Sequence, residues 1–402
     1  MLRRLCAPEE ATVAKRSPEF FLCFLIAGLC MAFWGCGSSS HFCGDCCAAA
    51  CPAQGNPYLY ATTTSNQILG FSIASTGALT PIASTTGPAN SPSIAGADWG
   101  LLFADSSSNQ VVVESQDIHT GFLTPVLGSP FSLGSVSGGP NSIVIGPPYG
   151  NMYASEPNGT IVGYSTSGNG PTAVLPGSPY AAGVAPTRMA FAQLTSSSSL
   201  AVTLYASDSG DPNGGILGFT IASDGSLSPI AGSPFATAPN AGPSYLFSAE
   251  NSTGSQFLFV SLSNAGEIAG FSIDNTTGAL TPIPGSPFTA GKGPGTLVAG
   301  MGDQLLVINT GDHTVEAFNI AANGLLTPIG SPVAVGTANG GLAFHPEWTQ
   351  SSSQLYAADT AASSIEIVNV DNNSGAISAG GTVSASVPPL QLVVDQFPLV
   401  FQ

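Results

Sequence analysis

The chain has 402 residues, of which 23 are acidic and only six are basic, so its formal net charge is −17. Four of the six basic residues lie in the first 35 positions, which leaves Arg188 and Lys292 as the only Arg or Lys beyond them. A surface with so few cations repels phosphate backbones, which excludes nucleic-acid binding. Phosphate sites usually gather several Arg or Lys side chains, so the composition also argues against a phosphorylated substrate.

Residues 1–35 are predicted to be an export signal of the lipoprotein type. A basic region around Arg3 and Lys15 precedes an apolar run from Phe20 to Gly35. That run has 16 residues, fewer than the roughly 20 that a helix needs to span a bilayer. Its end resembles a bacterial lipoprotein signal, in which the cysteine after the run, here Cys36, is lipidated. We therefore expect a lipid anchor at Cys36, with ordinary secretion as the alternative.

Residues 36–56 are predicted to be a tether between the anchor and the folded domain. All eight cysteines lie before residue 52, and four of them crowd this segment at Cys43, Cys46, Cys47 and Cys51. An exported segment meets oxidising conditions, which favour two local disulfides whose connectivity the sequence does not fix. The alternative is a zinc site, because Cys-x-x-Cys with the nearby His41 is a metal-binding pattern.

From residue 57 onward the chain repeats one pattern seven times. Each unit begins with an apolar segment such as Leu204-Tyr205-Ala206, and continues after a polar turn with a Gly-Phe segment such as Gly218-Phe219. A third segment reads Leu-Thr-Pro-Ile or a close variant, and a fourth apolar segment follows a proline such as Pro243. The first segments of the seven units start at Leu59, Leu102, Met152, Leu204, Leu258, Leu306 and Leu355.

This repeat predicts an all-β fold, because its segments are short, rich in β-branched and aromatic residues, and bounded by Gly, Pro, Asn and Ser. The unit length runs from 43 residues (Tyr60 to Phe103) to 54 residues (Tyr205 to Phe259). Four strands in each of seven units of this length predict a seven-bladed β-propeller over residues 57–402. A β-sandwich is the alternative, although it would not explain the repeat.

The two ends of the repeat region predict how the ring closes. The first unit lacks a proline-led strand before it, whereas the chain carries an unattached one near its end, from Pro389 to Val394. We expect this C-terminal strand to complete the first blade, which would remove the open edges of the ring.

The Leu-Tyr-Ala, Gly-Phe-x-Ile and Leu-Thr-Pro-Ile segments resemble those of lactonase-like seven-bladed propellers. That group includes a bacterial phosphogluconolactonase family and the related YVTN-repeat surface proteins, and the resemblance covers Pro57 to Val394. It implies the propeller fold and, for the enzymes of the group, hydrolytic opening of sugar lactones. This chain lacks the basic cluster that a phosphorylated lactone would need.

The expected channel mouth provides the candidate binding site. The proline-led strands should be innermost, and they begin on the face that we call the top. The residues expected at these strand starts are Ser93, Ser142, Arg188, Tyr245, Thr296, Gly341 and Gln391. Arg188 would hold a carboxylate or polarise a carbonyl oxygen. The alternative is a structural salt bridge between Arg188 and a neighbouring acid.

The histidines differ in their expected positions. His313 shares a top turn with Asp312, so a hydrolase would use His313 as its base while Arg188 polarises the lactone carbonyl. His119 and His345 are expected in turns on the opposite, bottom face. Nucleophile-elbow and His-Glu-x-x-His zinc motifs are absent from the sequence.

Turns on the top face carry carboxylates in units two to seven, at Asp105, Glu156, Asp208, Asp211, Glu267, Asp312 and Asp359. Such a ring would attract a divalent cation, for which Asp208, Asp312 and Asp359 are the candidate ligands. The preferred interpretation is that these acids are ordinary turn residues. No other cofactor is indicated.

These features together predict a lipid-anchored monomer of the bacterial cell envelope, facing the periplasm or the exterior. Its membrane contact would be the lipid anchor, and its top face would bind a small-molecule or protein partner. We expect a binding or scaffold role. The alternative is a hydrolase that opens an unphosphorylated sugar lactone or a similar ester.

The anchor hypothesis has a direct test. Because thioether attachment of the lipid requires the cysteine sulfur, Cys36→Ser should move the protein from the membrane fraction to the soluble fraction of an expressing bacterium. Cys30→Ser, at a cysteine within the apolar run, serves as the control and should leave the protein with the membranes. Unchanged membrane retention of Cys36→Ser would exclude this anchor.

Overall fold

The computed structural model describes residues 57–97, 100–134, 138–146, 150–194, 201–347 and 351–395. The predictions for the signal, for Cys36 and for the cysteine-rich tether lie outside these residues. Within the described ranges no helix combines the length and the apolar composition that crossing a bilayer requires.

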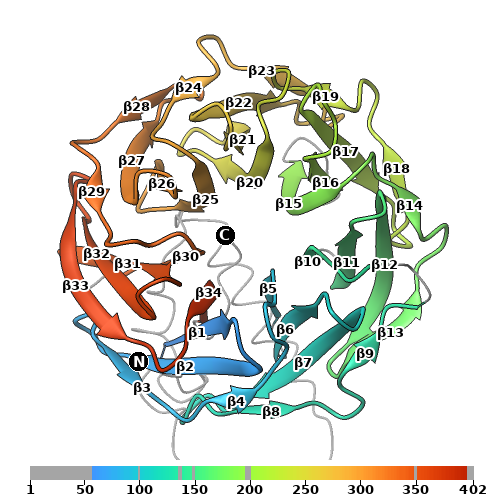
Figure 1. Cartoon of the computed structure of the whole chain (residues 1–402). Coiled ribbons are helices and arrows are strands. Elements are labelled where there is room, and N and C mark those ends of the chain that lie inside the picture. The colour runs from blue at the N-terminus through green and yellow to red at the C-terminus, as the bar shows by residue number, and fades with distance from the viewer. Residues whose placement is uncertain are drawn as a thin grey trace, which may run out of the picture. The chain divides into compact units, whose positions relative to one another are not determined.

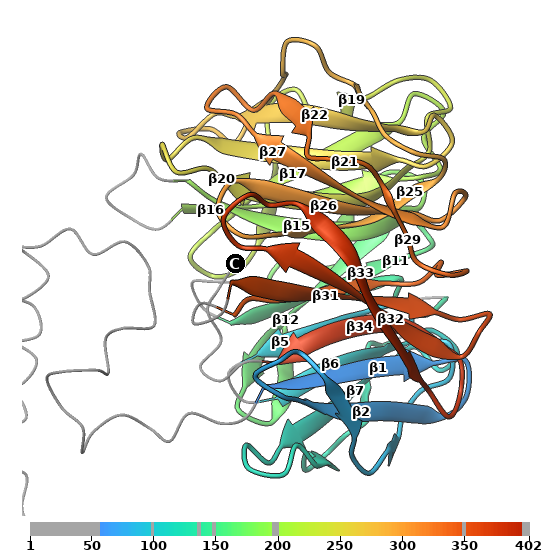
Figure 2. The same ribbon diagram turned by 90° about the vertical axis from the view of Figure 1, so that its left-hand side faces the viewer.

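Seven antiparallel sheets surround a central axis (Figure 1), and their strands run between the two faces of the ring (Figure 2). The innermost strands, in blade order, are β34 (Pro389–Asp395), β5 (Ile94–Ala97), β10 (Ser142–Gly146), β15 (Pro186–Leu194), β20 (Pro243–Glu250), β25 (Pro294–Ala299) and β30 (Leu342–His345). The second strands are β1 (Tyr58–Thr63), β6 (Gly100–Asp105), β11 (Asn151–Glu156), β16 (Ala201–Asp208), β21 (Gln256–Leu262), β26 (Gln304–Asn309) and β31 (Ser352–Asp359).

The outer half of each blade holds the remaining strands. The third strands are β2 (Gln67–Ile73), β7 (Gln110–Gln116), β12 (Thr160–Ser167), β17 (Gly215–Ile221), β22 (Glu267–Ile273), β27 (Thr314–Ile320) and β32 (Ser364–Asp371). The fourth strands are β3 (Leu79–Pro81), β8 (Leu123–Pro125), β13 (Gly170–Val174), β18 (Leu227–Pro229), β23 (Leu280–Pro282), β28 (Leu326–Pro328) and β33 (Ile377–Ser384). This arrangement confirms the predicted all-β, seven-bladed propeller with four-stranded blades.

Six blades add a two-residue strand that pairs with the third strand. These short strands are β4 (Thr85–Thr86), β9 (Phe131–Ser132), β14 (Tyr180–Ala181), β19 (Phe235–Ala236), β24 (Phe288–Thr289) and β29 (Val333–Ala334). Five of them come from the end of the repeated Gly-Ser-Pro-Phe segment or a close variant of it, whereas β4 follows Ala83-Ser84. The four-strand prediction did not assign these residues to a strand.

The repeated Gly-Ser-Pro-Phe segment fastens the outer edge of a blade. In blade five the amide of Gly270 donates a hydrogen bond of 2.8 Å to Oγ of Ser286. The same contact recurs with Ser129, Ser178 and Ser233. The following ring of Phe288 packs over Gly270, where a Cβ atom would approach it to 2.8 Å. A glycine in the third strand is therefore required for the aromatic ring to pack there.

The ring closes as predicted, through the two ends of the repeat region. Strand β34 pairs antiparallel with β1, with Val394 opposite Leu59 and Leu392 opposite Ala61. The first blade thus takes its inner strand from the C-terminal end and its other strands from the N-terminal end (Figure 1). Without β34, the edge of β1 that faces the channel would be unpaired.

Tyrosines of the second strands join neighbouring blades. The hydroxyl of Tyr205 donates a buried hydrogen bond of 2.6 Å to the carbonyl of Gly278, in the turn of the next blade. Equivalent bonds run from Tyr60, Tyr153 and Tyr356 to the carbonyls of Gly121, Gly225 and Gly77. Three second strands carry an apolar residue at this position, namely Phe103, Phe259 and Val307.

Removing one of these hydroxyls should weaken the ring. Tyr205→Phe leaves the buried carbonyl of Gly278 without its donor, so the free energy of unfolding should fall by about 1–3 kcal/mol. Denaturant titration would measure this. Tyr164→Phe is the matched control, because the Tyr164 hydroxyl forms no hydrogen bond with the described residues, and it should change stability little. Equal losses in both variants would contradict a specific role for the inter-blade bond.

Candidate functional site

Arg188 lies across the mouth of the central channel, at the start of the inner strand β15. Its Nη1 donates hydrogen bonds to the backbone carbonyls of Pro92 (2.5 Å) and Asn141 (3.1 Å), which belong to blades two and three. Its Nη2 donates to the hydroxyl of Tyr245 in blade five at 2.8 Å. The guanidinium carbon also lies 4.6 Å from the centre of the Tyr245 ring. One side chain therefore links four of the seven blades.

The positive charge of Arg188 has no carboxylate partner among the described residues. A guanidinium has five N–H donors, and three are used in the contacts above. The Nε–H group and one hydrogen on Nη2 remain for a ligand. By contrast, the ammonium group of the exposed Lys292 lies 3.9 Å from a carboxylate oxygen of Asp312.

A cavity of about 400 Å³ adjoins the guanidinium on the top face. Its walls come mostly from blades four and five and are rich in hydroxyl, amide and backbone groups. The lining residues are Pro92, Asn141, Thr187, Arg188, Ser209, Gly242, Pro243, Ser244, Tyr245, Ser263 and Asn264. These walls suit a small polyhydroxylated molecule, and Arg188 is the one charged side chain among them.

Tyr245 connects Arg188 to the closing strand. Its hydroxyl donates a hydrogen bond of 3.4 Å to Oε1 of Gln391 in β34. Burial alone would raise the pKa of the Tyr245 phenol, but the adjacent Arg188 charge and neighbouring hydrogen bonds outweigh it, so this pKa is lowered. The nearby Thr296, at the start of β25, has a buried hydroxyl without a hydrogen-bond partner in the described part of the chain.

The other predicted mouth residues have structural contacts. Ser93 is buried, and its Oγ accepts a hydrogen bond of 3.1 Å from the amide of Ile143 in the next blade. Ser142 is likewise buried. The amide of Gly341 donates to the carbonyl of Leu390 at 2.7 Å. The structure therefore brings Arg188, Tyr245 and Gln391 into one polar network that does not include the two serines.

His313 does not join this network. It lies in the turn between β26 and β27, and its Nδ1 atom is 3.4 Å from the carbonyl oxygen of Ala338. It is not among the residues that line the cavity beside Arg188. The predicted pairing of His313 with Arg188 at one reacting group is therefore not present in this geometry.

The candidate metal ligands are separate from one another and hold backbone segments. The carboxylate of Asp208 accepts hydrogen bonds of 2.8 Å from the amides of Val184 and Ala185, just before its inner strand. Asp359 accepts from the amides of Thr337 and Ala362, and Asp312 from that of Lys292. The described ranges contain no group of three or more His, Cys, Asp or Glu side chains that could hold a metal ion.

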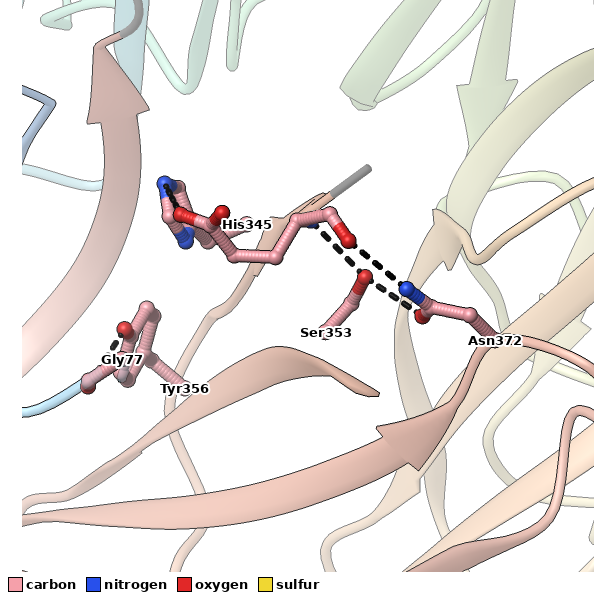
Figure 3. Close-up of polar contacts among 6 residues, drawn as sticks. Gly77, His345, Ser353, Tyr356 and Asn372 are labelled. Carbon is pink, nitrogen blue, oxygen red and sulfur yellow. Dashed lines mark hydrogen bonds and ion pairs between the residues drawn. The ribbon is translucent and has the colours of Figure 1, made fainter. Parts of the chain in front are cut away.

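A second polar cluster lies at the bottom end of blade seven (Figure 3). Nε2 of His345 is 3.5 Å from Oε1 of Glu347. The Glu347 amide donates to Oγ of Ser353, the Ser353 hydroxyl donates to Oδ1 of Asn372, and Nδ2 of Asn372 donates back to the Glu347 carbonyl. This closed set of bonds ties Glu347, just after β30, to Ser353 in β31 and to Asn372 just after β32.

The placement of His345 in a turn is wrong. His345 is the last residue of the inner strand β30 and is only 2% exposed. Burial lowers the pKa of its imidazole to about 4, so the ring is neutral at neutral pH. A ring this deeply buried cannot reach a substrate, and the cluster is structural. His119 is in a bottom turn, where its carbonyl accepts a bond from Tyr58.

Glu156 is a buried acid at a position where two other blades have aspartate. It ends β11 as Asp208 ends β16 and Asp359 ends β31. Its side chain is fully buried, and neither carboxyl oxygen has a hydrogen-bond partner among the described residues. Burial raises the pKa of Glu156 to about 7. Ionisation of this group therefore opposes folding near neutral pH.

This raised pKa gives a pH-dependent prediction. Ionisation in the unfolded chain begins near pH 4.5, whereas the folded group resists it until about pH 7, so the stability cost grows as pH rises through this window. Glu156→Gln removes the cost and should stabilise the protein by up to about 3 kcal/mol at pH 8, and by much less at pH 4.

Thermal unfolding of both proteins from pH 4 to pH 8 measures this difference. Glu250→Gln, which changes an exposed carboxylate at the end of β20, is the control and should show no comparable trend. A Glu156→Gln effect that does not vary with pH would contradict the assignment.

Comparison with known proteins shows the fold of the chain and goes no further. No protein-family model matches the sequence, and no curated protein matches it. A periplasmic gluconolactonase of Pseudomonas aeruginosa is similar in structure, with a TM-score of 0.68 and 16% identity over 85% of this chain and 99% of the other.

A Bacteroides fragilis protein, provisionally assigned as a 6-phosphogluconolactonase, has a TM-score of 0.65 and 18% identity over 89% of this chain and 100% of its own. A Lactobacillus plantarum protein has a TM-score of 0.61 and 17% identity over 85% and 99%. At these identities the likeness establishes that the chain has the seven-bladed propeller fold of these lactonase-like structures.

Proposed function

We propose that the top cavity binds an unphosphorylated sugar lactone and opens it by hydrolysis. The observation that carries this proposal is Arg188, a half-buried cation without a carboxylate partner in the described residues, beside a cavity of about 400 Å³. Its two remaining N–H donors would bind the lactone carbonyl oxygen and stabilise the negative charge that develops there.

Tyr245 supplies the second group of the proposed reaction. A phenol of lowered pKa is a better general base than an ordinary tyrosine, and Arg188 stabilises its ionised form. In its ionised form, the Tyr245 phenolate would take a proton from the attacking water as the new C–O bond forms, which returns Tyr245 to the neutral phenol. The ring C–O bond of the lactone then breaks, and the leaving oxygen receives that proton. The product is a hydroxy acid whose carboxylate faces Arg188.

The cavity favours a substrate without a phosphate group. Arg188 is its one cation, and it already donates three hydrogen bonds to protein groups. Phosphate binding normally uses several cationic side chains or a cradle of amides. The hydroxyl and amide groups of Thr187, Ser209, Ser263 and Asn264 suit sugar hydroxyls instead.

Similarity to the Pseudomonas periplasmic gluconolactonase supports the proposal by analogy of fold. The same analogy supports an extracytoplasmic location. We retain the anchor at Cys36 and a monomeric state as part of this proposal.

A binding protein without turnover is the second candidate. The observation that favours it is that no imidazole or carboxylate lines the cavity, so Tyr245 is the one candidate base among its lining residues. In this case Arg188 would hold the carboxylate of a sugar acid, and the top face would present the complex to a partner.

One set of measurements distinguishes the hydrolase from the binding protein. Hydrolysis of glucono-1,5-lactone and of its 6-phosphate is followed for the wild type, and gluconate binding is measured by calorimetry. We expect turnover of the unphosphorylated lactone, with no gain from the phosphate. Arg188→Ala should lower kcat/KM on the order of 100-fold, and Tyr245→Phe should mainly lower kcat. Lys292→Ala, outside the cavity, is the control.

Two other outcomes would lead to different conclusions about the function. Gluconate binding without turnover, lost in Arg188→Ala, would establish the second candidate. Unchanged turnover in Arg188→Ala would place the reaction elsewhere. The assay is repeated with added Ca²⁺ or Mg²⁺, and we expect no dependence, because the carboxylates of Asp208 and Asp359 are already used by backbone amides.

A further inference from the structure

The closing strand contributes a residue to the polar network at the channel mouth. Gln391 is the third residue of β34, and its Oε1 accepts the hydrogen bond from the Tyr245 hydroxyl at 3.4 Å. The two residues are 146 positions apart in the sequence. They meet because β34 returns to the first blade, on the far side of the channel from β20.

The backbone around Gln391 is fixed on both sides. The backbone N–H of Gln391 donates a hydrogen bond of 3.1 Å to Oγ1 of Thr62 in β1. The carbonyl of the preceding Leu390 accepts a bond of 2.7 Å from the amide of Gly341 in blade seven. A Cβ atom on Gly341 would come within 2.8 Å of the Gln391 Oε1 atom, so the glycine leaves room for this amide.

The chemistry of an amide suits this contact. Arg188 is a permanent donor, so the oxygen of Tyr245 accepts from it and must direct its own proton elsewhere. Gln391 Oε1 is the acceptor for that proton. If the phenol ionises, rotation of the amide presents its NH₂ group to the phenolate, since glutamine can act as donor or acceptor. A carboxylate or an aliphatic side chain cannot serve both states.

We propose that Gln391 is a positioning residue that holds the Tyr245 phenol against Arg188 at the cavity, so that the site is complete only when β34 has closed the ring. This inference rests on the proposed function of the cavity for its catalytic meaning. The contact itself is tested without any substrate. Gln391 touches Tyr245 and acts through it.

The test is the ultraviolet titration of tyrosine ionisation in the full chain. Six buried tyrosines have raised pKa values, namely Tyr60, Tyr153, Tyr164, Tyr180, Tyr205 and Tyr356. Tyr245 should therefore ionise at a lower pH than these six tyrosines. The ionisation step that disappears from the titration curve of Tyr245→Phe is the step of Tyr245. Arg188 is the charged side chain that contacts Tyr245 in the described structure.

Gln391→Glu keeps the size of the side chain and places a carboxylate beside the phenol. The Tyr245 step should then move upward by at least about one pH unit, because a nearby negative charge disfavours the phenolate. Gln110→Glu, on the third strand of blade two, adds the same charge away from Tyr245 and should leave the step in place. If Gln391→Glu folds and the ionisation step of Tyr245 does not move, the proposal is overturned. An equal shift in the control Gln110→Glu would overturn it as well.

A second variant covers the case in which Gln391→Glu fails to fold. Gln391→Asn keeps the amide and the strand but shortens the reach, and should lower kcat at least tenfold while KM changes less than twofold. Wild-type values of both constants would overturn the positioning role. If the wild type opens no lactone, the proposed function fails, whereas the titration still decides whether Gln391 holds Tyr245.

Discussion

The pairing of β34 with β1 is the constraint on which the other parts of this propeller depend. Each complete blade packs only against its two neighbours, and β34 supplies Leu392 to the buried cluster that joins blades one and seven. Without this pairing, the first blade would lack its inner strand. The register that sets Val394 opposite Leu59 also decides which side chains face the core. A slip of one residue would exchange the positions of the buried Leu392 and of Gln391. Closure therefore determines both the stability of the ring and one side of the channel mouth.

The seams between blades are not equivalent. Four of them combine apolar packing with a buried tyrosine-to-carbonyl bond, whereas the seam between blades five and six relies on packing. There Phe257 and Phe259 share one buried cluster with Leu305 and Phe318 of the next blade. A phenylalanine needs no partner for a hydroxyl, so an apolar seam also avoids the cost of an unpaired buried group.

The repeat made the fold predictable because each repeated residue has a local physical role. A glycine in the third strand admits an aromatic ring, as Gly270 does for Phe288. The position of Arg188 at the mouth also followed from the order of strands. Its partners did not, because the carbonyls of Pro92 and Asn141 carry no signature in a sequence.

Radial position accounts for the absence of His313 from the residues that line the cavity beside Arg188. The turn between second and third strands lies farther from the axis than the start of an inner strand, so a residue can share the top face without lining that cavity. His345 shows a related limit. The sequence next to Pro346 favours a turn, but the inner strand β30 extends through His345 and buries it. Aligning the repeats predicts on which face of the ring a residue lies. It does not predict how far the residue is from the axis or how deeply it is buried.

The strand order also gives the two ends of the domain different mechanical strengths. β1 is hydrogen-bonded on both sides, to β2 and to β34, whereas β34 is bonded within its sheet on one side, to β1. A load applied at Pro57 along β1 must break the hydrogen bonds to β2 and to β34 together. The same load applied to β34 must break only the hydrogen bonds to β1. A molecule pulled from its N-terminal side, as by flow past a surface, would thus bear the force through the better-supported strand.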